Sequence, residues 1–270
     1  MPTLLLLTSA PEEYRPLIES ARLPGLEFTS EPEDAEIVVG EPGMIREMLP
    51  RLPHLKWAQA IYAGVERLMD PALRRDYSLT NARGVFGELM SEYVFGYLLF
   101  HEKKMFDRFR AQQAKRWDRA ESGMLRGKTI GLLGVGSIGS HLAGTAKHFS
   151  MSVHGYTRAS ESSPAVDRYY HGPDILEFAR GLDYLVSILP RTNDTNQIVN
   201  AELFDALPSH AVFVNVGRGN AVDEQALVAA LNEGQIAAAV LDVTAKEPLP
   251  EDHPFWRTPN LLLTFHTSAI

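Results

Sequence analysis

Hydrophobic residues along this chain fall into short, unbroken runs that are separated by stretches of helical spacing. Leu4 to Leu7, Ile37 to Val39 and Trp57 to Ile61 have the apolar character of buried strands. Residues Pro11 to Ser20 predict a helix, because proline suits the first helical turn. Strands that alternate with helices in this way predict a small doubly wound α/β domain.

The second half of the chain continues the alternation over a longer stretch. Strands are predicted over residues 129–133, 152–156, 183–188, 211–215, 236–241 and 261–264. Helices are predicted near residues 138–148, 173–180, 201–206 and 223–232. This order of elements predicts a second, parallel and doubly wound sheet.

Residues 88–117 join the two halves and predict one long helix, because they contain no proline. Their aromatic side chains point in more directions than a single apolar stripe covers. These residues are Tyr93, Phe95, Tyr97, Phe100, Phe106, Phe109 and Trp117. A helix that is apolar on several faces is expected to lie between domains or against a partner subunit.

The composition narrows the class of protein. The 270 residues suffice for one large or two ordinary domains, and the lack of cysteine excludes disulfides and thiolate catalysis. The net charge of −8 argues against a nucleic-acid partner, and the histidines have no metal-ligating spacing, so no metal is expected. No apolar stretch is long enough to span a bilayer and the N-terminus lacks a basic start, so a cytoplasmic protein without membrane contact is expected.

A glycine-rich turn follows the predicted strand 129–133. The run Gly134-Val135-Gly136-Ser137-Ile138-Gly139 matches G-x-G-x-x-G, and it leaves an apolar strand to open an amphipathic helix. The first glycine permits a tight turn, the second lets a pyrophosphate approach the backbone, and the third lets helix and strand pack closely. This context predicts a dinucleotide site; a purely structural turn and a methyl-donor nucleotide site are the alternatives.

The residues further along bear on the choice of cofactor. An NAD site usually carries an acidic residue for the ribose diol roughly 20 positions after the glycines. This chain has Thr157, Arg158 and Ser160 there instead. A guanidinium without a competing carboxylate suits a 2′-phosphate, so NADPH is predicted over NADH. The alternative is that Arg158 lies over the adenine and that both cofactors are used.

Three polar residues, Arg218, Glu247 and His266, each come shortly after a predicted strand of the second half. Open α/β folds bind ligands at the carboxyl ends of their strands, so these side chains are expected to lie together. Arg218 would bind a substrate carboxylate, His266 would protonate a ketone as hydride arrives, and Glu247 would orient the imidazole. The pattern predicts reduction of a 2-oxo acid to a 2-hydroxy acid.

These motifs together resemble the D-isomer-specific 2-hydroxyacid dehydrogenase family, from about residue 55 to the end of the chain. Besides the glycine loop, the matching pieces are Tyr62-Ala63-Gly64-Val65, Asn81-Ala82-Arg83-Gly84-Val85, Leu189-Pro190-Arg191-Thr192 with Thr195, Asn215 to Gly219, Leu241-Asp242-Val243 through Glu247-Pro248-Leu249, and His266. The resemblance implies two α/β domains, a flavodoxin-like substrate domain and a Rossmann dinucleotide-binding domain, with the active site between them. We place these domains at residues 1–92 and 93–270.

The resemblance also implies roles for individual residues. Arg218, Glu247 and His266 would be catalytic, and the product would be a D-2-hydroxy acid. The backbone of 63–65 (Ala63, Gly64 and Val65) would contact the substrate carboxylate. Further cofactor contacts, most of them on the nicotinamide side, would be Leu189, Pro190, Thr195, Val216, Gly217, Asp242 and Ser268. The pair Thr157-Arg158 is similar to NADPH-preferring members, including glyoxylate and hydroxypyruvate reductases, and a homodimer through residues 88–117 is expected.

The sequence departs from the family pattern in two places. Phe265 stands where members usually have proline, which would change the direction in which the chain enters His266. The chain also ends at Ile270, whereas members usually continue with a helix that crosses back to the first domain, so the closing element of the substrate domain is expected to be missing.

Two other functions compete with this interpretation. A non-catalytic, dinucleotide-gated sensor could use the same fold, although retention of arginine, glutamate and histidine together argues against it. Among enzymes, a dehydrogenase of phosphoglycerate-type substrates is the other candidate, but only Arg83 near residues 63–65 could serve a phosphate.

Overall fold

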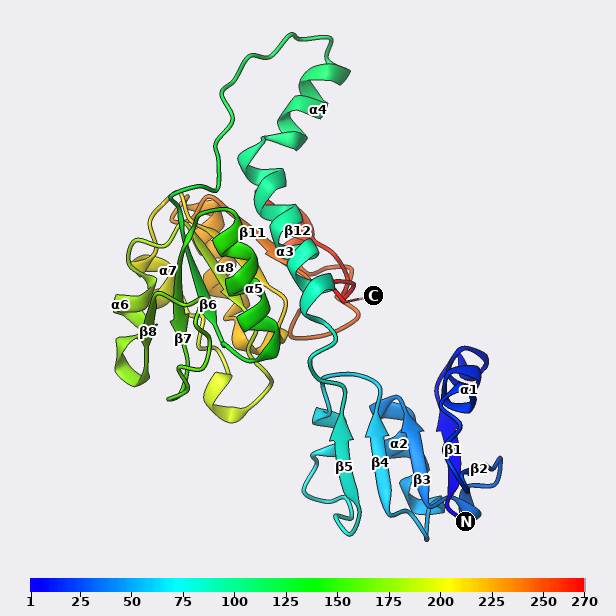
Figure 1. Cartoon of the computed structure of the whole chain (residues 1–270). Coiled ribbons are helices and arrows are strands. Elements are labelled where there is room, and N and C mark those ends of the chain that lie inside the picture. Colours follow the sequence, from blue (N-terminus) through cyan, green and yellow to red (C-terminus); the bar gives the residue numbers. More distant parts are fainter. Residues whose placement is uncertain (270) are drawn as a thin grey trace. The chain divides into compact units, whose positions relative to one another are not determined.

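The computed structural model describes residues 1–269, and the chain divides into two compact units, Met1–Val85 and Phe86–Ile270 (Figure 1). The sequence analysis placed its boundary after residue 92 instead. Helix α3 (Gly87–Glu102) is one continuous element, so all of it belongs to the second unit.

The first unit is a five-stranded sheet in which every pair of strands is parallel. Its strands are β1 (Thr3–Leu7), β2 (Glu27–Phe28), β3 (Ile37–Gly40), β4 (Trp57–Ala60) and β5 (Ser78–Asn81), and its helices are α1 (Pro11–Ser20) and α2 (Pro42–Met48). Three 3-10 turns complete it: η1 (Pro32–Asp34), η2 (Leu49–Arg51) and η3 (Glu66–Leu68). The strand order β2-β1-β3-β4-β5 is the flavodoxin-like order, which confirms the predicted fold of this unit.

The second unit is a seven-stranded sheet, also parallel throughout. Its strands are β6 (Thr129–Leu133), β7 (Ser152–Tyr156), β8 (Arg168–Tyr170), β9 (Tyr184–Ser187), β10 (Val212–Asn215), β11 (Ala238–Leu241) and β12 (Leu261–Leu263). Helices α3, α4 (Met105–Gln113), α5 (Ser137–His148), α6 (Ile175–Ala179), α7 (Ala201–Ala206) and α8 (Glu224–Asn232) accompany it, with 3-10 turns η4 (Gly172–Asp174), η5 (Asn193–Thr195), η6 (Gly219–Ala221) and η7 (Pro254–Arg257). The order β12-β11-β10-β9-β6-β7-β8 reverses between β6 and β9, which is the switch point of a Rossmann fold.

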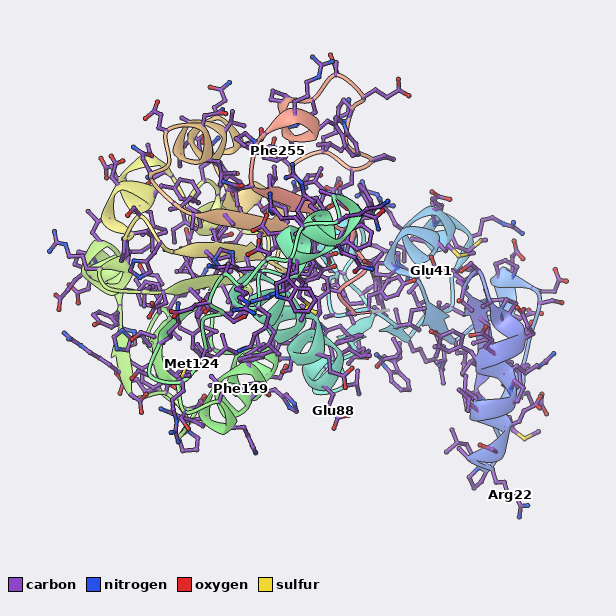
Figure 2. The ribbon with its side chains drawn as sticks, turned by 90° about the horizontal axis from the view of Figure 1, so that it is seen from above. Arg22, Glu41, Glu88, Met124, Phe149 and Phe255 are labelled. Atoms are coloured by element: carbon purple, nitrogen blue, oxygen red, sulfur yellow. The ribbon has the colours of Figure 1, made fainter. Side chains whose placement is uncertain are left out.

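Successive residues of these strands face two separate hydrophobic layers. On one face, Phe178, Phe204 and Leu227 of α6, α7 and α8 pack with Leu185 and Phe213 of the sheet. On the other face, a second cluster gathers residues of α3 and α5: Met90, Val94, Phe95, Leu98, Leu142, Ala143 and Ala146. Phe255 belongs to the first layer and Phe149 packs against the second (Figure 2). Helices therefore cover both faces of the sheet, as the predicted doubly wound fold requires.

The predicted helix 88–117 is wrong in its length. Helix α3 ends at Glu102 and α4 begins at Met105, because Lys104 adopts a left-handed conformation with φ of 50° and turns the chain. Tertiary contacts accompany the break: Glu102 pairs with Lys128 at 2.8 Å, and Lys103 Nζ donates to the carbonyl of Gly123 at 2.8 Å. The aromatic side chains point in many directions because they lie on two helices and the loop that follows.

Candidate active site

In the second unit, all strands run in the same direction, so the loops after them meet at one edge of the sheet, the carboxyl edge. These loops carry Gly134–Gly139 after β6, Thr157–Ser160 after β7, His171 after β8, Leu189–Thr195 after β9, Val216–Gly219 after β10, Asp242–Glu247 after β11 and His266 after β12. The edge thus collects almost every residue of this unit that the sequence analysis selected.

The glycine loop makes a tight turn that packs closely against the start of α5. Gly134 has φ of 98°, and its N–H donates to the carbonyl of Tyr156 at 3.0 Å, so this position favours glycine. A Cβ at Gly139 would lie 2.3 Å from the carbonyl oxygen of Gly134. The helix and the turn can approach this closely only because residue 139 is glycine. Gly136, by contrast, caps α5 and is exposed, and the described residues place no atom within 4 Å of its Cβ position. Packing therefore does not require glycine there, whereas close approach of a phosphate to the N-terminus of α5 would.

Thr157, Arg158 and Ser160 lie in the loop after β7, the strand next to β6, which carries the glycine loop. The Thr157 hydroxyl donates to the carbonyl of Ser160 at 2.7 Å and so closes a tight turn. Arg158 projects into solvent and pairs with Asp194 of the loop after β9, with Nη2 and Oδ2 2.8 Å apart.

His171 braces the same turn. Its Nδ1 donates to the carbonyl of Thr157 at 3.0 Å, and its Nε2 lies 2.9 Å from a carboxylate oxygen of Glu161. The hydrogen bond that His171 donates to Glu161, followed by that to the carbonyl of Thr157, raises the pKa of His171, so its charged form is favoured. The sequence analysis missed both His171 and Asp194. His171 follows β8, whose residues Arg168–Tyr170 form no apolar run, and nothing in the sequence around Asp194 indicates that it reaches Arg158.

The loop after β9 is rigidly built. Thr195 is buried, and its hydroxyl donates to the carbonyl of Pro190 at 2.7 Å and accepts the N–H of Thr192 at 3.0 Å. Leu189 lies against Gly217 of the neighbouring loop, where a Cβ would come within 2.6 Å of its backbone nitrogen and oxygen. Val216 is buried and donates its N–H to Ser187 at 3.0 Å. The hydroxyl of Thr195 is thus engaged within the loop, and the predicted cofactor contacts of these residues remain proposals.

The structure brings two of the three predicted catalytic side chains into direct contact. His266 Nδ1 lies 2.8 Å from Glu247 Oε2, and the other oxygen of Glu247 accepts the N–H of Thr244 at 3.0 Å. Because Nδ1 faces a carboxylate, it carries a proton, and Nε2 is left as the nitrogen that can exchange a proton with a ligand. The two side chains are 52% and 39% exposed, so a ligand can reach the imidazole.

Arg218 lies in the adjoining loop. Its Nη1 donates to the carbonyl of Gly217 at 2.8 Å, and its own carbonyl accepts from the side-chain amide of Asn215 at 3.2 Å. The next residue, Gly219, packs so closely on the backbone of Thr244 that a Cβ would lie 1.9 Å from the Thr244 carbonyl carbon. The loop of Arg218 and the loop of Glu247 are therefore in van der Waals contact through their backbones.

Asp242 organises the chain around His266. It is only 2% exposed, and its carboxylate accepts the hydroxyl of Thr264 at 2.8 Å and the N–H groups of Thr267 at 2.7 Å and Ser268 at 3.1 Å. Its backbone carbonyl accepts the N–H of His266 at 2.6 Å. Asp242 and Ser268 were expected to contact the cofactor; here their hydrogen bonds with each other hold the imidazole-bearing segment in place.

The backbone conformation at Phe265 explains why proline, which family members usually have at this position, is absent. Phe265 and His266 have φ of 58° and 60°, in the left-handed region, where a proline with φ near −65° does not fit. The ring of Phe265 is 67% exposed and lies 5.9 Å from that of Trp256, centroid to centroid.

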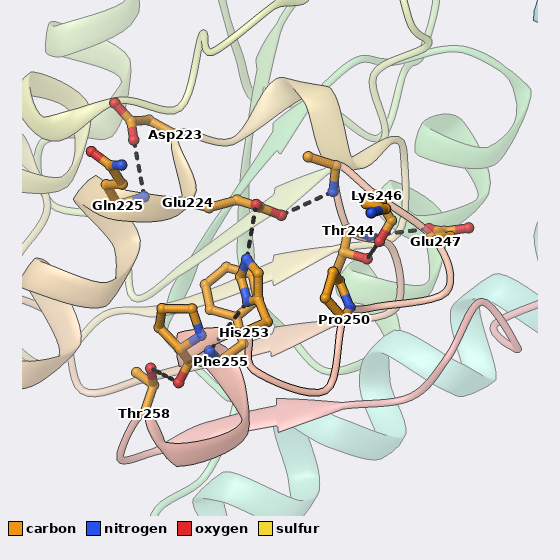
Figure 3. A network of polar contacts seen from close by, with 12 residues as sticks. Asp223, Glu224, Gln225, Thr244, Lys246, Glu247, Pro250, His253, Phe255 and Thr258 are labelled. Atoms are coloured by element: carbon orange, nitrogen blue, oxygen red, sulfur yellow. Dashed lines mark hydrogen bonds and ion pairs between the residues drawn. The ribbon is translucent and has the colours of Figure 1, made fainter.

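A polar network fixes the loop that carries Glu247 (Figure 3). Glu224 at the start of α8 accepts the N–H of Ala245 at 2.9 Å and lies 3.3 Å from Nε2 of His253. His253 Nδ1 accepts the N–H of Phe255 at 3.3 Å, so the ring proton sits on Nε2 and points at Glu224. Both ends of the loop are thereby tied to α8.

In the first unit, the predicted substrate contacts follow β4. Asn81 Nδ2 donates to the carbonyl of Ala63 at 2.6 Å, and Val65 lines a pocket of about 340 Å³ together with Leu68, Met69, Arg75, Tyr77, Leu79, Thr80 and Asn81. Ala63 is exposed and Gly64 is half-buried.

Residues 1–269 contain no group of three or more His, Asp or Glu side chains that could hold a metal ion. Within the same range, none of the helices has both the length and the apolar character that a membrane crossing needs.

Comparison with known proteins places this geometry in a family. The family model of the D-isomer specific 2-hydroxyacid dehydrogenase, NAD binding domain, matches residues 95–268. A glyoxylate/hydroxypyruvate reductase A from Yersinia enterocolitica is 33% identical over 248 residues, which cover 89% of this chain and 78% of the relative. The chain belongs to the D-isomer-specific 2-hydroxyacid dehydrogenase family.

Solved structures agree. A family member from Aeromonas salmonicida is 40% identical, with a TM-score of 0.93 over 99% of this chain and 89% of that one. An NADPH-dependent glyoxylate/hydroxypyruvate reductase from Sinorhizobium meliloti, in complex with NADP and sulfate, is 26% identical, with a TM-score of 0.87 over 100% of this chain and 90% of that one. The chain is therefore a nicotinamide-dependent 2-hydroxyacid dehydrogenase.

Proposed function

We propose that this protein uses NADPH to reduce a small 2-oxo acid to the D-2-hydroxy acid. The observation that carries the proposal is the Glu247–His266 contact of 2.8 Å at the same sheet edge as the glycine loop. The glyoxylate and hydroxypyruvate reductases among the relatives support small 2-oxo acids as the substrate class.

In this proposal, each residue has a separate role. The bound cofactor supplies the hydride. Arg218 binds the substrate carboxylate, and its guanidinium helps to polarise the carbonyl. His266 Nε2 delivers a proton to the oxygen as negative charge develops there, while Glu247 accepts Nδ1–H and orients the ring.

The glycine loop would hold the pyrophosphate, and Thr157, Arg158 and Ser160 would surround the 2′-phosphate. The four residues directly after β7, 157–160, include no acidic residue, which supports NADPH as the preferred cofactor. NADH remains a weaker alternative cofactor in this proposal. The loops after β9 and β10 would line the nicotinamide.

The test is a steady-state comparison of a panel of 2-oxo acids with NADPH and NADH. Arg218→Ala and His266→Ala should each lower kcat/KM by roughly a hundredfold or more, as expected for loss of an anion clamp or a general acid. His210→Ala, which removes an exposed histidine just before β10 at the opposite edge, should change little. Binding of NADPH without turnover of any 2-oxo acid would instead favour a dinucleotide-gated sensor.

Assembly and location complete the proposal. We propose that the protein is cytoplasmic and forms a homodimer through residues 88–117. The dimer is proposed because this segment exposes large apolar side chains: Leu89, Met105, Phe106, Phe109 and Trp117. Sedimentation equilibrium that shows only monomers at micromolar concentration would contradict the dimer.

A further inference from the structure

The contact between Arg158 and Asp194 is formed at the place where the 2′-phosphate of NADPH is proposed to bind. The guanidinium and carboxylate are 2.8 Å apart, and their side chains are 78% and 75% exposed. Sequence reasoning found no acid beside Arg158, since the acid comes from another loop, 36 residues further along the chain.

The sheet order shows what this contact crosses. Arg158 follows β7 and Asp194 lies in the loop after β9, and β6 lies between these two strands. The ion pair therefore spans the end of the strand that carries the glycine loop. In a Rossmann site, the adenosine ribose lies at the end of the strand corresponding to β7.

Asp194 is held in this position by its loop. It lies in η5 between Thr192 and Thr195, whose side chains and backbone form a reciprocal capping box, and Thr195 is anchored on Pro190. These hydrogen bonds fix the backbone conformation of the loop that presents Asp194 to Arg158.

We infer that Asp194 is a specificity-determining residue, which competes with the 2′-phosphate for Arg158 and so limits the preference for NADPH over NADH. This inference rests on the proposed function. An exposed ion pair stabilises little, so a phosphate can displace it. Displacement leaves a carboxylate close to a phosphate of the same charge sign, which reduces the net gain from the guanidinium.

The test measures ligand binding without turnover, by calorimetry with 2′,5′-ADP and 5′-ADP. Asp194→Asn should tighten 2′,5′-ADP binding by roughly three- to tenfold and change 5′-ADP binding by less than about twofold. In an Arg158→Ala background, Asp194→Asn should tighten 2′,5′-ADP binding less, because the guanidinium for which carboxylate and phosphate compete is gone. The NADPH/NADH ratio of kcat/KM should rise with the 2′,5′-ADP affinity.

Glu177→Gln is the matched control. It removes one carboxylate from another exposed arginine pair, with Arg168 at 2.6 Å, and Arg168 begins β8 at the opposite edge of the sheet. This variant should bind both ligands as the wild type does.

Unchanged or weaker 2′,5′-ADP binding in Asp194→Asn would overturn the inference, even if the protein reduces 2-oxo acids. The expected tightening in a protein that turns over no 2-oxo acid would support the inference and refute the reductase. A wild-type protein that binds neither ligand would refute the proposed cofactor site and the inference together.

Discussion

The two ends of the carboxyl edge hold their polar side chains in opposite ways. At β11 and β12, a carboxylate that is 2% exposed, that of Asp242, receives two backbone N–H groups and one hydroxyl. At β7 and β9, Arg158 and Asp194 meet in solvent with three quarters or more of each side chain exposed. Buried charge-assisted hydrogen bonds are costly to break, whereas an exposed pair can be exchanged for a ligand. The first arrangement would suit the proton donor proposed here, which must stay in place, and the second would suit the proposed cofactor site, which must open.

Asp242→Asn, at the buried carboxylate near β11 and β12, should lower kcat/KM more than the other substitutions in this comparison. The amide keeps one acceptor oxygen, and its NH2 group would face the N–H of Thr267 or Ser268, so the segment around His266 should shift. A displacement of this kind is expected to lower kcat/KM by about a hundredfold. Binding of 2′,5′-ADP should stay within about twofold, because the substitution does not reach the β7 end.

The control is Asp252→Asn, which makes the same chemical change at an exposed position of the loop between β11 and β12. It should leave kcat/KM unchanged. A parallel loss of 2′,5′-ADP binding in Asp242→Asn would show that the two ends are not independent.

Phe265→Pro should have an intermediate effect. Proline does not adopt the φ of 58° seen at Phe265, so the turn into His266 must rearrange, and kcat/KM should fall by at least about tenfold. Phe265→Gly accepts this φ and is expected to stay within a few-fold of the wild type. If both variants were equally impaired, the aromatic ring rather than the backbone conformation would be the cause.

The charge of His171, near the exposed pair at β7 and β9, should have the smallest effect, a change in the affinity for 2′,5′-ADP. Because Glu161 and Thr157 raise the pKa of His171, the imidazolium persists above the usual 6.5 and is lost as the pH rises through the raised value. Wild-type affinity for 2′,5′-ADP should therefore weaken by about twofold more than that of His171→Gln between pH 6 and 9. His148→Gln, at the exposed C-terminal end of α5, should follow the wild type. Identical pH profiles for wild type and His171→Gln would show that the charge of His171 does not contribute to 2′,5′-ADP binding.

Local patterns in the sequence were sufficient to locate most strands. Apolar runs located β1, β3, β4, β6, β7 and β9 to β12 to within about two residues, because buried parallel strands need unbroken apolar stretches. Two of the strands at sheet edges lack that signal: β5 reads Ser-Leu-Thr-Asn with no buried residue, and β8 reads Arg-Tyr-Tyr with only Tyr170 buried.

The tertiary structure alone decided which distant residues meet. Strand ends and family motifs predicted that Glu247 and His266 lie at one edge, and parallel pairing of β11 with β12 brings them into contact. The break at Lys104, the role of Asp242 as an anchor and the reach of Asp194 to Arg158 left no local trace. Each depends on contacts between segments far apart in the chain, and such contacts arise from the packing of the whole sheet and not from the preferences of any one segment.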